Sequence, residues 1–414
     1  MVSVDHDLEK YKVDGYIPSK TISPKSPESL ADLLRIASEN RWNVIPFGFG
    51  NMMNIGSIPN GYDIALDLNQ MPKYIQHNSE DLTVTCSSNT SFGELNLKLQ
   101  EKQQWLPFDS PLINDQSVGG LLACNLPGSL NACFGYIRDY VIGMKTATPF
   151  GQITKSGGTV VKNVTGYDLS KILSGSFGTL TILSEIAIKV LPKPLCNKTL
   201  VIDNPHLKKA IEYLNLALSS SSDVSGGAFY PEIFRNYFSL NDLTIKGALT
   251  AIRVEGPQNS VDQRIDKLKK ELKVNTDEVS VLETQQSNLF WKNTQNLSVF
   301  SNIKNNLIRL VVPPSSTFDL LQKMKKYQIN YFIDWGGNLI WVEINKINTK
   351  ILKEINDIVR EYQGYLTVIK IEEHLKAQVD IFAIDPIKYK ISEKIKKSFD
   401  PKRILNPGKM YIGI

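Results

Sequence analysis

The chain has 414 residues, 42% of them hydrophobic and 21% charged, and 47 Lys and Arg against 42 Asp and Glu residues give a formal net charge of +5. This length predicts two or three domains, and a mild charge whose lysines are widely spread does not indicate a nucleic-acid partner. No run approaches the roughly 20 apolar residues of a membrane helix, and acidic residues near the start do not fit a signal peptide, so we expect no membrane span and a cytoplasmic location.

Helix and strand patterns alternate from residue 26 to residue 194. Ser26 and Pro27 form an N-cap and first-turn pair in front of an apolar helix face. Strands are predicted at 43–46, 64–68, 82–86 and 180–191. We interpret the Pro-Lys-Pro stretch at 192–194 as the end of a first domain that covers residues 14–194.

Residues 195–384 show the order βαββαβ twice, with a hairpin of the second unit turning at Gly336 and Gly337. Each of three predicted helices, at 205–219, 258–272 and 349–362, carries one apolar stripe. Such helices pack on one face of an antiparallel sheet, so we expect two ferredoxin-like halves joined into a larger sheet, in an α+β fold. This second domain is interpreted as a cap over a cofactor domain or a docking platform. Residues 285–304 fit neither half.

The last segment, residues 385–414, is predicted to leave the cap and pack back on the first domain. Asp385 and Pro386 begin a helix in which apolar residues recur every four positions from Ile387 to Phe399. The lysines between them predict an amphipathic helix with a solvated lysine face.

Three glycine-punctuated segments indicate nucleotide binding. A strand-like stretch leads into residues 47–51, a helix with two glycines in its first turn begins at 117, and an almost uncharged run extends from 157 to 180. Glycine lets backbone N–H groups approach a phosphate and permits positive φ. Each segment alone is weak, since Gly-x-Gly is more often only a turn and a Gly-Gly helix start can be a close helix contact.

The order and spacing of these segments resemble the flavin-binding domain of the vanillyl-alcohol oxidase and p-cresol methylhydroxylase (PCMH) superfamily. Within that superfamily, residues 105–109, 117–120, 138–143, 162–168 and 334–337 are similar to the smaller FAD-binding subunit (E subunit) of bacterial glycolate oxidase. The closing residues 399–409 are similar to a motif of the wider superfamily. The resemblance is dense over residues 26–194 and returns at the C-terminus.

The resemblance implies a PCMH-type domain that binds FAD. It implies that residues 48–52 lie on the pyrophosphate and that Ser117, Gly119 and Gly120 lie near the isoalloxazine ring. It also implies that Gly178, Thr179 and Ile182 line the adenine and phosphate side. The expected cofactor-binding residues are Phe47, Gly48, Phe49, Gly50, Asn51, Met52, Ser117, Gly119, Gly120, Gly178, Thr179 and Ile182.

Histidine and cysteine placement indicates how the cofactor is held. No histidine lies in a glycine segment, so we expect non-covalent FAD; Cys124 and Cys133 lie close to the second segment but are expected to be core residues. The four scattered cysteines, which also include Cys86 and Cys196, lack a Cys-x-x-Cys pair. This chain is therefore not expected to hold an iron–sulfur cluster or another metal itself.

Oxidation of a 2-hydroxy acid requires a base for the hydroxyl proton and a cation for the carboxylate. The cap offers His206, Arg253, Arg309 and His374, of which His374 is expected to be exposed and the arginines to line one sheet face. No catalytic residue is assigned.

The resemblance implies an accessory subunit that works with a larger FAD-linked glycolate oxidase subunit and an iron–sulfur subunit in the oxidation of glycolate. A free-standing FAD-dependent 2-hydroxy-acid dehydrogenase and a flavin-fold scaffold without catalysis are the alternatives.

Overall fold

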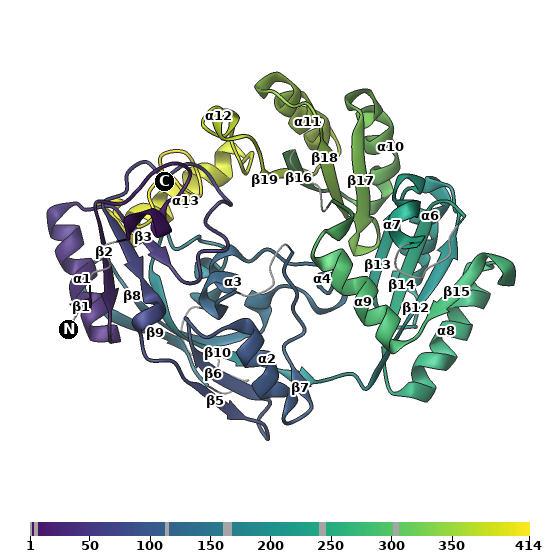
Figure 1. Ribbon diagram of the computed structural model, residues 1–414, viewed down its shortest axis with the longest axis horizontal. Coiled ribbons are helices and arrows are strands. Elements are labelled where there is room, and N and C mark those ends of the chain that lie inside the picture. The colour runs from purple at the N-terminus through teal and green to yellow at the C-terminus, as the bar shows by residue number, and fades with distance from the viewer. Residues whose placement is uncertain (1, 4–6, 112–115, 160–167, 240–245, 301–305) are drawn as a thin grey trace.

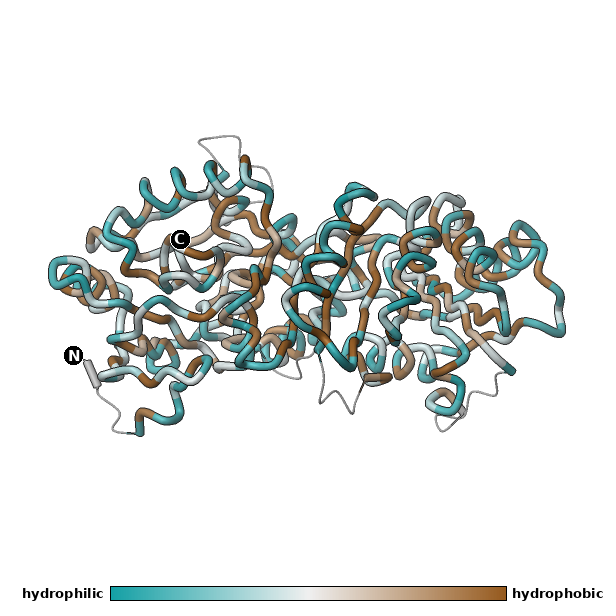
Figure 2. The backbone as a smooth tube through the Cα atoms, turned by 90° about the horizontal axis from the view of Figure 1, so that it is seen from above, coloured by the Kyte–Doolittle hydropathy of each residue, from teal (hydrophilic) through white to brown (hydrophobic). Residues whose placement is uncertain are grey.

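The structure is a computed structural model that describes residues 2–3, 7–111, 116–159, 168–239, 246–300 and 306–414. Two smaller sheets lie at one end of the molecule and an eight-stranded sheet lies at the other (Figure 1). Seen from above, polar helices run along the outside and most apolar stretches lie within (Figure 2). The expected α+β class is confirmed. No helix among the described residues is long and apolar enough to cross a membrane.

The first sheet is four-stranded, in the order β1-β2-β4-β3, with β2, β4 and β3 parallel. These strands span, in chain order, Val2–Ser3, Lys20–Pro24, Val44–Phe47 and Ile64–Asp67. Helix α1 (Pro27–Asn40) connects β2 to β3, and the Ser26 side chain accepts a hydrogen bond from Ser29 N. The N-cap and the first-turn proline therefore begin this helix as expected.

The second sheet is five-stranded and antiparallel, in the order β5-β6-β10-β8-β9. Its strands span, in chain order, Ile75–Asn78, Thr83–Ser87, Val141–Ala147, Ile153–Gly157 and Ile182–Lys189. The helices α2 (Phe92–Gln100), α3 (Val118–Cys124) and α5 (Ser170–Leu173) lie near it, whereas α4 (Asn131–Phe134) lies against the cap. Two short strands, β7 (Gln104–Trp105) and β11 (Leu191–Pro192), pair just before the proposed domain boundary.

The cap is built on one sheet in the order β15-β12-β14-β13-β17-β18-β16-β19. The strands span, in chain order, Cys196–Asp203, Val224–Tyr230, Leu249–Gly256, Val279–Leu282, Asn306–Val311, Ile329–Asp334, Leu339–Ile344 and Tyr365–Lys370. The halves meet between β13 and β17, where Phe229 pairs with Ile333. The two βαββαβ units thus form one larger sheet, as expected.

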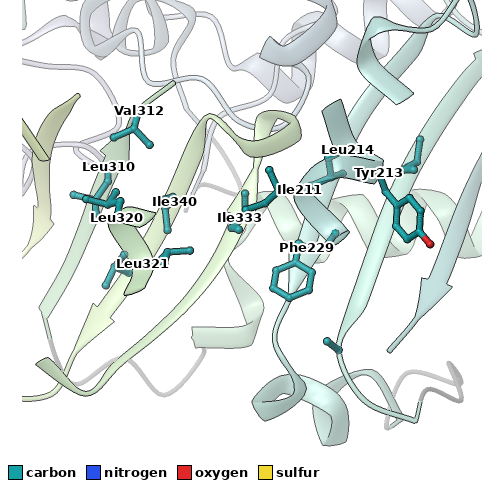
Figure 3. Packing of buried hydrophobic residues seen from close by; sticks show 14 of the residues in the cluster. Ile211, Tyr213, Leu214, Phe229, Leu310, Val312, Leu320, Leu321, Ile333 and Ile340 are labelled. Atoms are coloured by element: carbon teal, nitrogen blue, oxygen red, sulfur yellow. The ribbon is translucent and has the colours of Figure 1, made fainter. Parts of the chain in front are cut away.

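Helices cover one face of the cap sheet: α6 (Leu207–Ser219), α8 (Gln258–Leu272), α10 (Pro314–Met324) and α11 (Thr349–Glu361). Figure 3 shows side chains of α6 and α10 against the strands of both halves. Ile355 of α11 and Ile308 of β16 are fully buried in this core. Burying each such side chain stabilises the fold by about 1.5–3 kcal/mol, and an Ile355→Ala substitution would cost about 2–5 kcal/mol.

The other face of the cap sheet packs against the first domain and against α9 (Thr284–Gln295). Phe290 and Trp291 of α9 are buried there, and Trp291 Nε1 donates to Thr199 Oγ1 at 2.8 Å. The described part of the unassigned 285–304 segment therefore packs with one face against the sheet, while its other face, with Leu289, is exposed. A short helix, α7 (Arg235–Ser239), lies in the same region.

The C-terminal segment packs back on the first domain, where α13 (Pro386–Phe399) lies near β3 (Figure 1). Val44 N donates to Ile404 O, and Asn406 N donates to Val44 O, both at 2.8 Å. The expectation of a solvated lysine face on α13 is wrong at Lys396, which is completely buried, whereas Ile387 is 71% exposed. The periodic pattern identified the helix but not the face that the first domain covers.

Candidate functional site

A cavity lies where the two smaller sheets meet, on the side of the first domain toward the cap. It encloses about 950 Å³ of space, including the solvent at its mouth. Residues of all three glycine segments and of the C-terminal segment line it. Of the twelve residues that the sequence singles out, ten line this cavity: Gly48, Phe49, Gly50, Asn51, Met52, Ser117, Gly119, Gly120, Gly178 and Ile182.

The other two residues of that set lie behind the cavity wall. The Phe47 ring is buried, with its centroid 5.2 Å from that of Tyr11 and 6.4 Å from that of Tyr62. Thr179 Oγ1 donates to Ser176 O at 2.7 Å. Both side chains therefore support the loops that carry the lining residues and do not line the space themselves.

The first glycine loop follows directly from β3. Gly50 has a φ of +79°, and a Cβ built on Gly48 would lie 2.5 Å from Ser117 Oγ. Within the described chain, no hydrogen bond engages the backbone N–H groups of Gly48, Phe49 and Gly50. Successive unpaired N–H groups in such a loop form an anion-binding concavity. This loop can therefore bind phosphate oxygens through its backbone.

The second glycine loop is bound within the protein. Ser117 caps α3 and its Oγ accepts from Gly120 N at 3.1 Å, while Gly119 N donates to Ser88 O at 2.8 Å. A Cβ on Gly119 would lie 2.9 Å from Ser88 O. These glycines therefore allow α3 to approach the neighbouring strand closely, and their N–H groups are not free donors for a ligand.

The third glycine segment closes the cavity from the opposite side, although its residues 160–167, which include most of the 162–168 motif, lie outside the described residues. Asp168 Oδ1 accepts from Ser170 N at 3.1 Å and so supports the first turn of α5. Gly178 has a φ of +67°, and a Cβ on it would lie 2.9 Å from Pro46 Cγ. The backbone here passes too close to β3 for any larger residue.

Sequence reasoning missed a charged side chain of the cavity. Lys409 lines it with 2% of the residue exposed and is the one charged residue among the lining residues that the structure describes. Its Nζ donates to Asp14 Oδ2 at 2.8 Å. Burial, reinforced by the charge of Lys376, lowers the pKa of Lys409 to about 8 although Asp14 acts in the opposite direction. The closing motif already contained this lysine, but its pattern did not reveal where Nζ lies.

Several buried polar atoms of the cavity wall have no partner in the described protein. They are Asn89 Oδ1, Gln116 Oε1, Thr181 Oγ1 and Asn406 Oδ1. Leaving such an atom unpaired costs about 1–3 kcal/mol, so a ligand with N–H and O–H donors would be stabilised here. FAD carries these donors on its ring, ribityl chain and adenine, together with phosphate oxygens for the first loop. The residues present therefore fit FAD.

The cysteine expectations need correction at two positions. Cys86 and Cys196 are buried, but Cys133 is exposed and Cys124 lines the cavity, so neither of the two cysteines near the second glycine segment is a core residue. Burial raises the pKa of Cys124 to about 12, which disfavours the thiolate. Among the described residues, no group of three or more His, Cys, Asp and Glu side chains could hold a metal ion.

The cap turns two buried arginines toward the first domain. Arg253 lies 4.5 Å from the Trp291 ring and Arg309 lies 4.7 Å from the Trp335 ring. Arg309 Nε and Nη2 are buried with no hydrogen-bond partner in the described chain, and burial lowers the pKa of Arg309. The arginines lie on one sheet face, whereas the side chain of His374 is 68% exposed.

A buried carboxyl group of the cap contacts the first domain, because Ser129 Oγ donates to Asp334 Oδ2 at 2.6 Å. The half-buried Asp109 lies nearby within the first domain, where its Oδ1 accepts from Leu130 N at 3.1 Å. Burial raises the pKa of Asp334 to about 7 and that of Asp109 to about 6. The indole of Trp335 adds a hydrogen bond to Gly128 O at 2.7 Å. Hydrogen bonds of Asp334 and Trp335 therefore accompany the apolar contacts between the two domains.

The sequence is similar to a known family and to known proteins. The family described as FAD binding domain matches residues 18–157. The chain is 26% identical to "Glycolate oxidase subunit GlcD" of Bacillus subtilis (strain 168), over 95% of this chain and 89% of that protein. It is 27% identical to "Glycolate oxidase subunit GlcE" of Escherichia coli (strain K12), over 84% and 87%. "D-lactate dehydrogenase" of Anaerostipes hadrus is 25% identical, over 95% and 89%.

Solved structures share the fold across the whole chain. A 4-ethylphenol oxidase from Gulosibacter chungangensis superposes with a TM-score of 0.74 at 14% identity, covering 100% of this chain and 94% of that one. A p-cresol methylhydroxylase with bound substrate gives 0.73 at 15% identity, covering 99% and 93%. The chain is therefore an FAD-dependent oxidoreductase that carries an FAD-binding domain and has the PCMH-type flavoprotein fold.

Proposed function

We propose that this chain is the FAD-binding subunit of a cytoplasmic complex that oxidises glycolate to glyoxylate. Its partners are a larger FAD-linked subunit and an iron–sulfur subunit. The observation that carries the proposal is that two glycolate oxidase subunits, GlcD and GlcE, match at least 84% of the chain. Glycolate loses two electrons and two protons in this reaction, and bound FAD is the group that accepts electrons.

The cavity residues would hold FAD without a covalent bond. Backbone N–H groups of residues 48–50 would bind the diphosphate, while Gln116 and Asn89 offer oxygens to the N–H and O–H groups of the cofactor. No histidine lines the cavity in the described part of the chain, and the pKa of Cys124 is raised to about 12. A nucleophile for covalent attachment is therefore lacking.

Two features support an accessory role. The histidines of the cap, His206 and His374, are both exposed, so neither is a base held at the cavity. No group of three or more His, Cys, Asp and Glu side chains in the described parts of the chain could hold a metal ion, and the four cysteines are free. Electrons would therefore have to leave FAD for a partner chain and not for a relay within this one.

The test is glycolate-dependent reduction of an electron-accepting dye. The isolated, FAD-loaded chain should give a rate near background, and the rate should rise when the partner subunits from native cells are added. Affinity purification from those cells should recover the larger flavoprotein and the iron–sulfur chain. Full turnover by the single purified chain would exclude the accessory role.

A free-standing dehydrogenase for another 2-hydroxy acid is the second candidate. The buried pair Arg253 and Arg309 favours it, because a carboxylate needs a cation and Arg309 has unpaired N–H groups. The D-lactate dehydrogenase relative, which also spans 95% of the chain, agrees with this substrate class. If the chain is such a dehydrogenase, mixing the FAD-loaded protein with a panel of 2-hydroxy acids should rapidly bleach the flavin absorbance with at least one of them. Absence of bleaching with every acid, alone and with partners, would instead indicate a scaffold.

A further inference from the structure

Three segments that are far apart in the sequence meet at one carboxylate beside the FAD cavity. Asp14 comes from the N-terminal segment, Lys376 from α12 (Glu373–Lys376) at the end of the cap, and Lys409 from the C-terminal segment. Lys409 Nζ donates to Asp14 Oδ2 at 2.8 Å, and Lys376 Nζ donates to Asp14 Oδ1. Lys376 also donates to Asn54 O at 2.8 Å. We call these three side chains the Asp14 triad.

The charges of the Asp14 triad do not balance. Two ammonium groups share one carboxylate. The side chains of Lys376, Asp14 and Lys409 are only 8%, 6% and 2% exposed, respectively. Cys124 also faces Lys409, but its raised pKa of about 12 keeps the thiol neutral. A buried charge without a partner is strongly destabilising, so an anion beside these side chains would be stabilised.

The cavity wall itself does not provide that anion. Of the lining residues that the structure describes, none is an Asp or Glu, and Lys409 is the charged one. Lys376 and Asp14 line a second cavity, together with the exposed residues Lys12, Lys370 and Glu373. Of the triad, Lys409 alone therefore reaches the space that FAD would occupy.

We propose that Lys409 is the counter-charge of an anionic group of FAD, and that Asp14 and Lys376 are positioning residues that hold it there. This proposal rests on the FAD site described above and not on the identity of the oxidised substrate. It makes the N-terminal segment and the end of the cap part of the cofactor site, although neither carries a glycine loop.

FAD offers two anionic groups to such a lysine. The diphosphate is always charged, whereas the isoalloxazine gains one negative charge when it takes up two electrons and one proton. The position of Lys409 favours the ring, because its neighbour Cys124 and the lining residues Met52 and Ile55 pack in the same apolar cluster as cap residues. The experiment must therefore distinguish a contact of Lys409 with the diphosphate from a contact with the reduced isoalloxazine.

The test compares Lys409→Met, Lys409→Arg and the control Lys402→Met in the full-length protein. Lys402 lies in the same segment but is exposed and bonds to Ser38 O. Affinity for oxidised FAD is measured by quenching of flavin fluorescence, and affinity for reduced FAD follows from the reduction potential. Lys409→Met should weaken binding of at least one form about tenfold or more, as loss of a charge-assisted hydrogen bond does. Lys409→Arg should retain most of the affinity, and Lys402→Met should be unchanged.

The pattern of losses identifies the anionic group. Equal losses for both forms indicate the diphosphate, while a loss confined to reduced FAD, with a lowered reduction potential, indicates the ring. Unchanged affinity for both forms in a folded Lys409→Met protein overturns the proposal. Failure of the wild-type chain to bind FAD would instead reject the FAD site on which the proposal rests.

Asp14→Asn tests the positioning role through pH. Asp14 holds the pKa of Lys409 up against burial and the charge of Lys376, so its loss should let Lys409 release its proton at lower pH. FAD affinity of Asp14→Asn should therefore begin to fall at a lower pH than that of the wild type. Lys376→Met, which leaves Lys409 paired with Asp14, should not move the fall to lower pH. A fall at the same pH in Asp14→Asn and in the wild type would contradict the positioning role.

Discussion

Lys396 Nζ lies 2.8 Å from Asp400 Oδ2, one turn further along the C-terminal segment, and neither side chain is exposed to solvent. The ammonium group also donates to Thr179 O at 2.7 Å and to Leu405 O at 2.9 Å. The lysine is therefore fully hydrogen-bonded and joins α13 to the first domain beside the cavity. Burial lowers the pKa of Lys396, but the carboxylate of Asp400 opposes that effect.

Lys396→Met should strongly destabilise the protein, because it leaves the buried carboxylate of Asp400 unpaired. Removing one partner of a buried pair costs about 3–5 kcal/mol. Chemical denaturation measures the free energy of unfolding. The matched control, Lys397→Met on the exposed side of the same helix, should change it by less than about 0.5 kcal/mol. Equal stability of the two variants would show that the buried pair does not hold this segment.

Asp334 predicts a pH dependence of stability. Its pKa is raised from 3.8 to about 7 by burial, so the folded state binds the proton more tightly than the unfolded state does. The stabilisation is complete below about pH 4 and is lost as pH rises through about 7. The free energy of unfolding should therefore fall over this window, by an amount on the order of a few kcal/mol.

Asp334→Asn should remove most of that slope, because an amide resembles the neutral acid and can keep the contacts to Ser129 and Trp335 N. The variant should match the wild type near about pH 5 and exceed its stability near about pH 8. Thermal unfolding across this range measures the effect, with Asp357→Asn on an exposed helix face as control. A variant with the full wild-type slope would exclude Asp334 as its source; Asp109, whose pKa is also raised, would then be tested.

Gly48→Ala should sharply reduce FAD binding in a folded protein. The new Cβ would lie 2.5 Å from Ser117 Oγ and would push apart the first and second glycine loops. The double variant Gly48→Ala/Ser117→Ala removes that oxygen and should recover part of the affinity. Flavin absorbance retained after gel filtration measures binding. A single variant with wild-type flavin content would contradict the assignment of these loops to the cofactor.

FAD should be released when the protein is precipitated with acid. Cys124 is the lining residue of the described cavity that could form a covalent bond, and its pKa of about 12 keeps it protonated. Cys124→Ala should therefore release the same fraction of flavin into the supernatant as the wild type. Yellow colour that stays with the wild-type pellet, and leaves it in Cys124→Ala, would show a covalent link to this residue.

The sequence alone predicted most of the elements, because their signals are local. Capping at Ser26, the apolar stripes of α6, α8 and α11, and the hairpin at Gly336 each depend on residues within a few positions of one another. Glycines such as Gly48 and Gly178 also marked the loops, since close backbone approach tolerates no side chain there. The doubled βαββαβ order then determined how the cap sheet could be assembled.

Only the tertiary structure decided which charged residues are buried. Asp14 and Lys409 lie 395 positions apart, and nothing near either residue in the sequence indicates the other. The recurrence of apolar residues in α13 likewise predicted that Lys396 is exposed to solvent, although the first domain covers it. The burial of a long polar side chain depends on what packs over it and on whether its charge finds partners there, and both are properties of contacts between segments. The glycine pattern thus indicated the loops of the FAD site, whereas only the tertiary structure showed that Lys409 lines it.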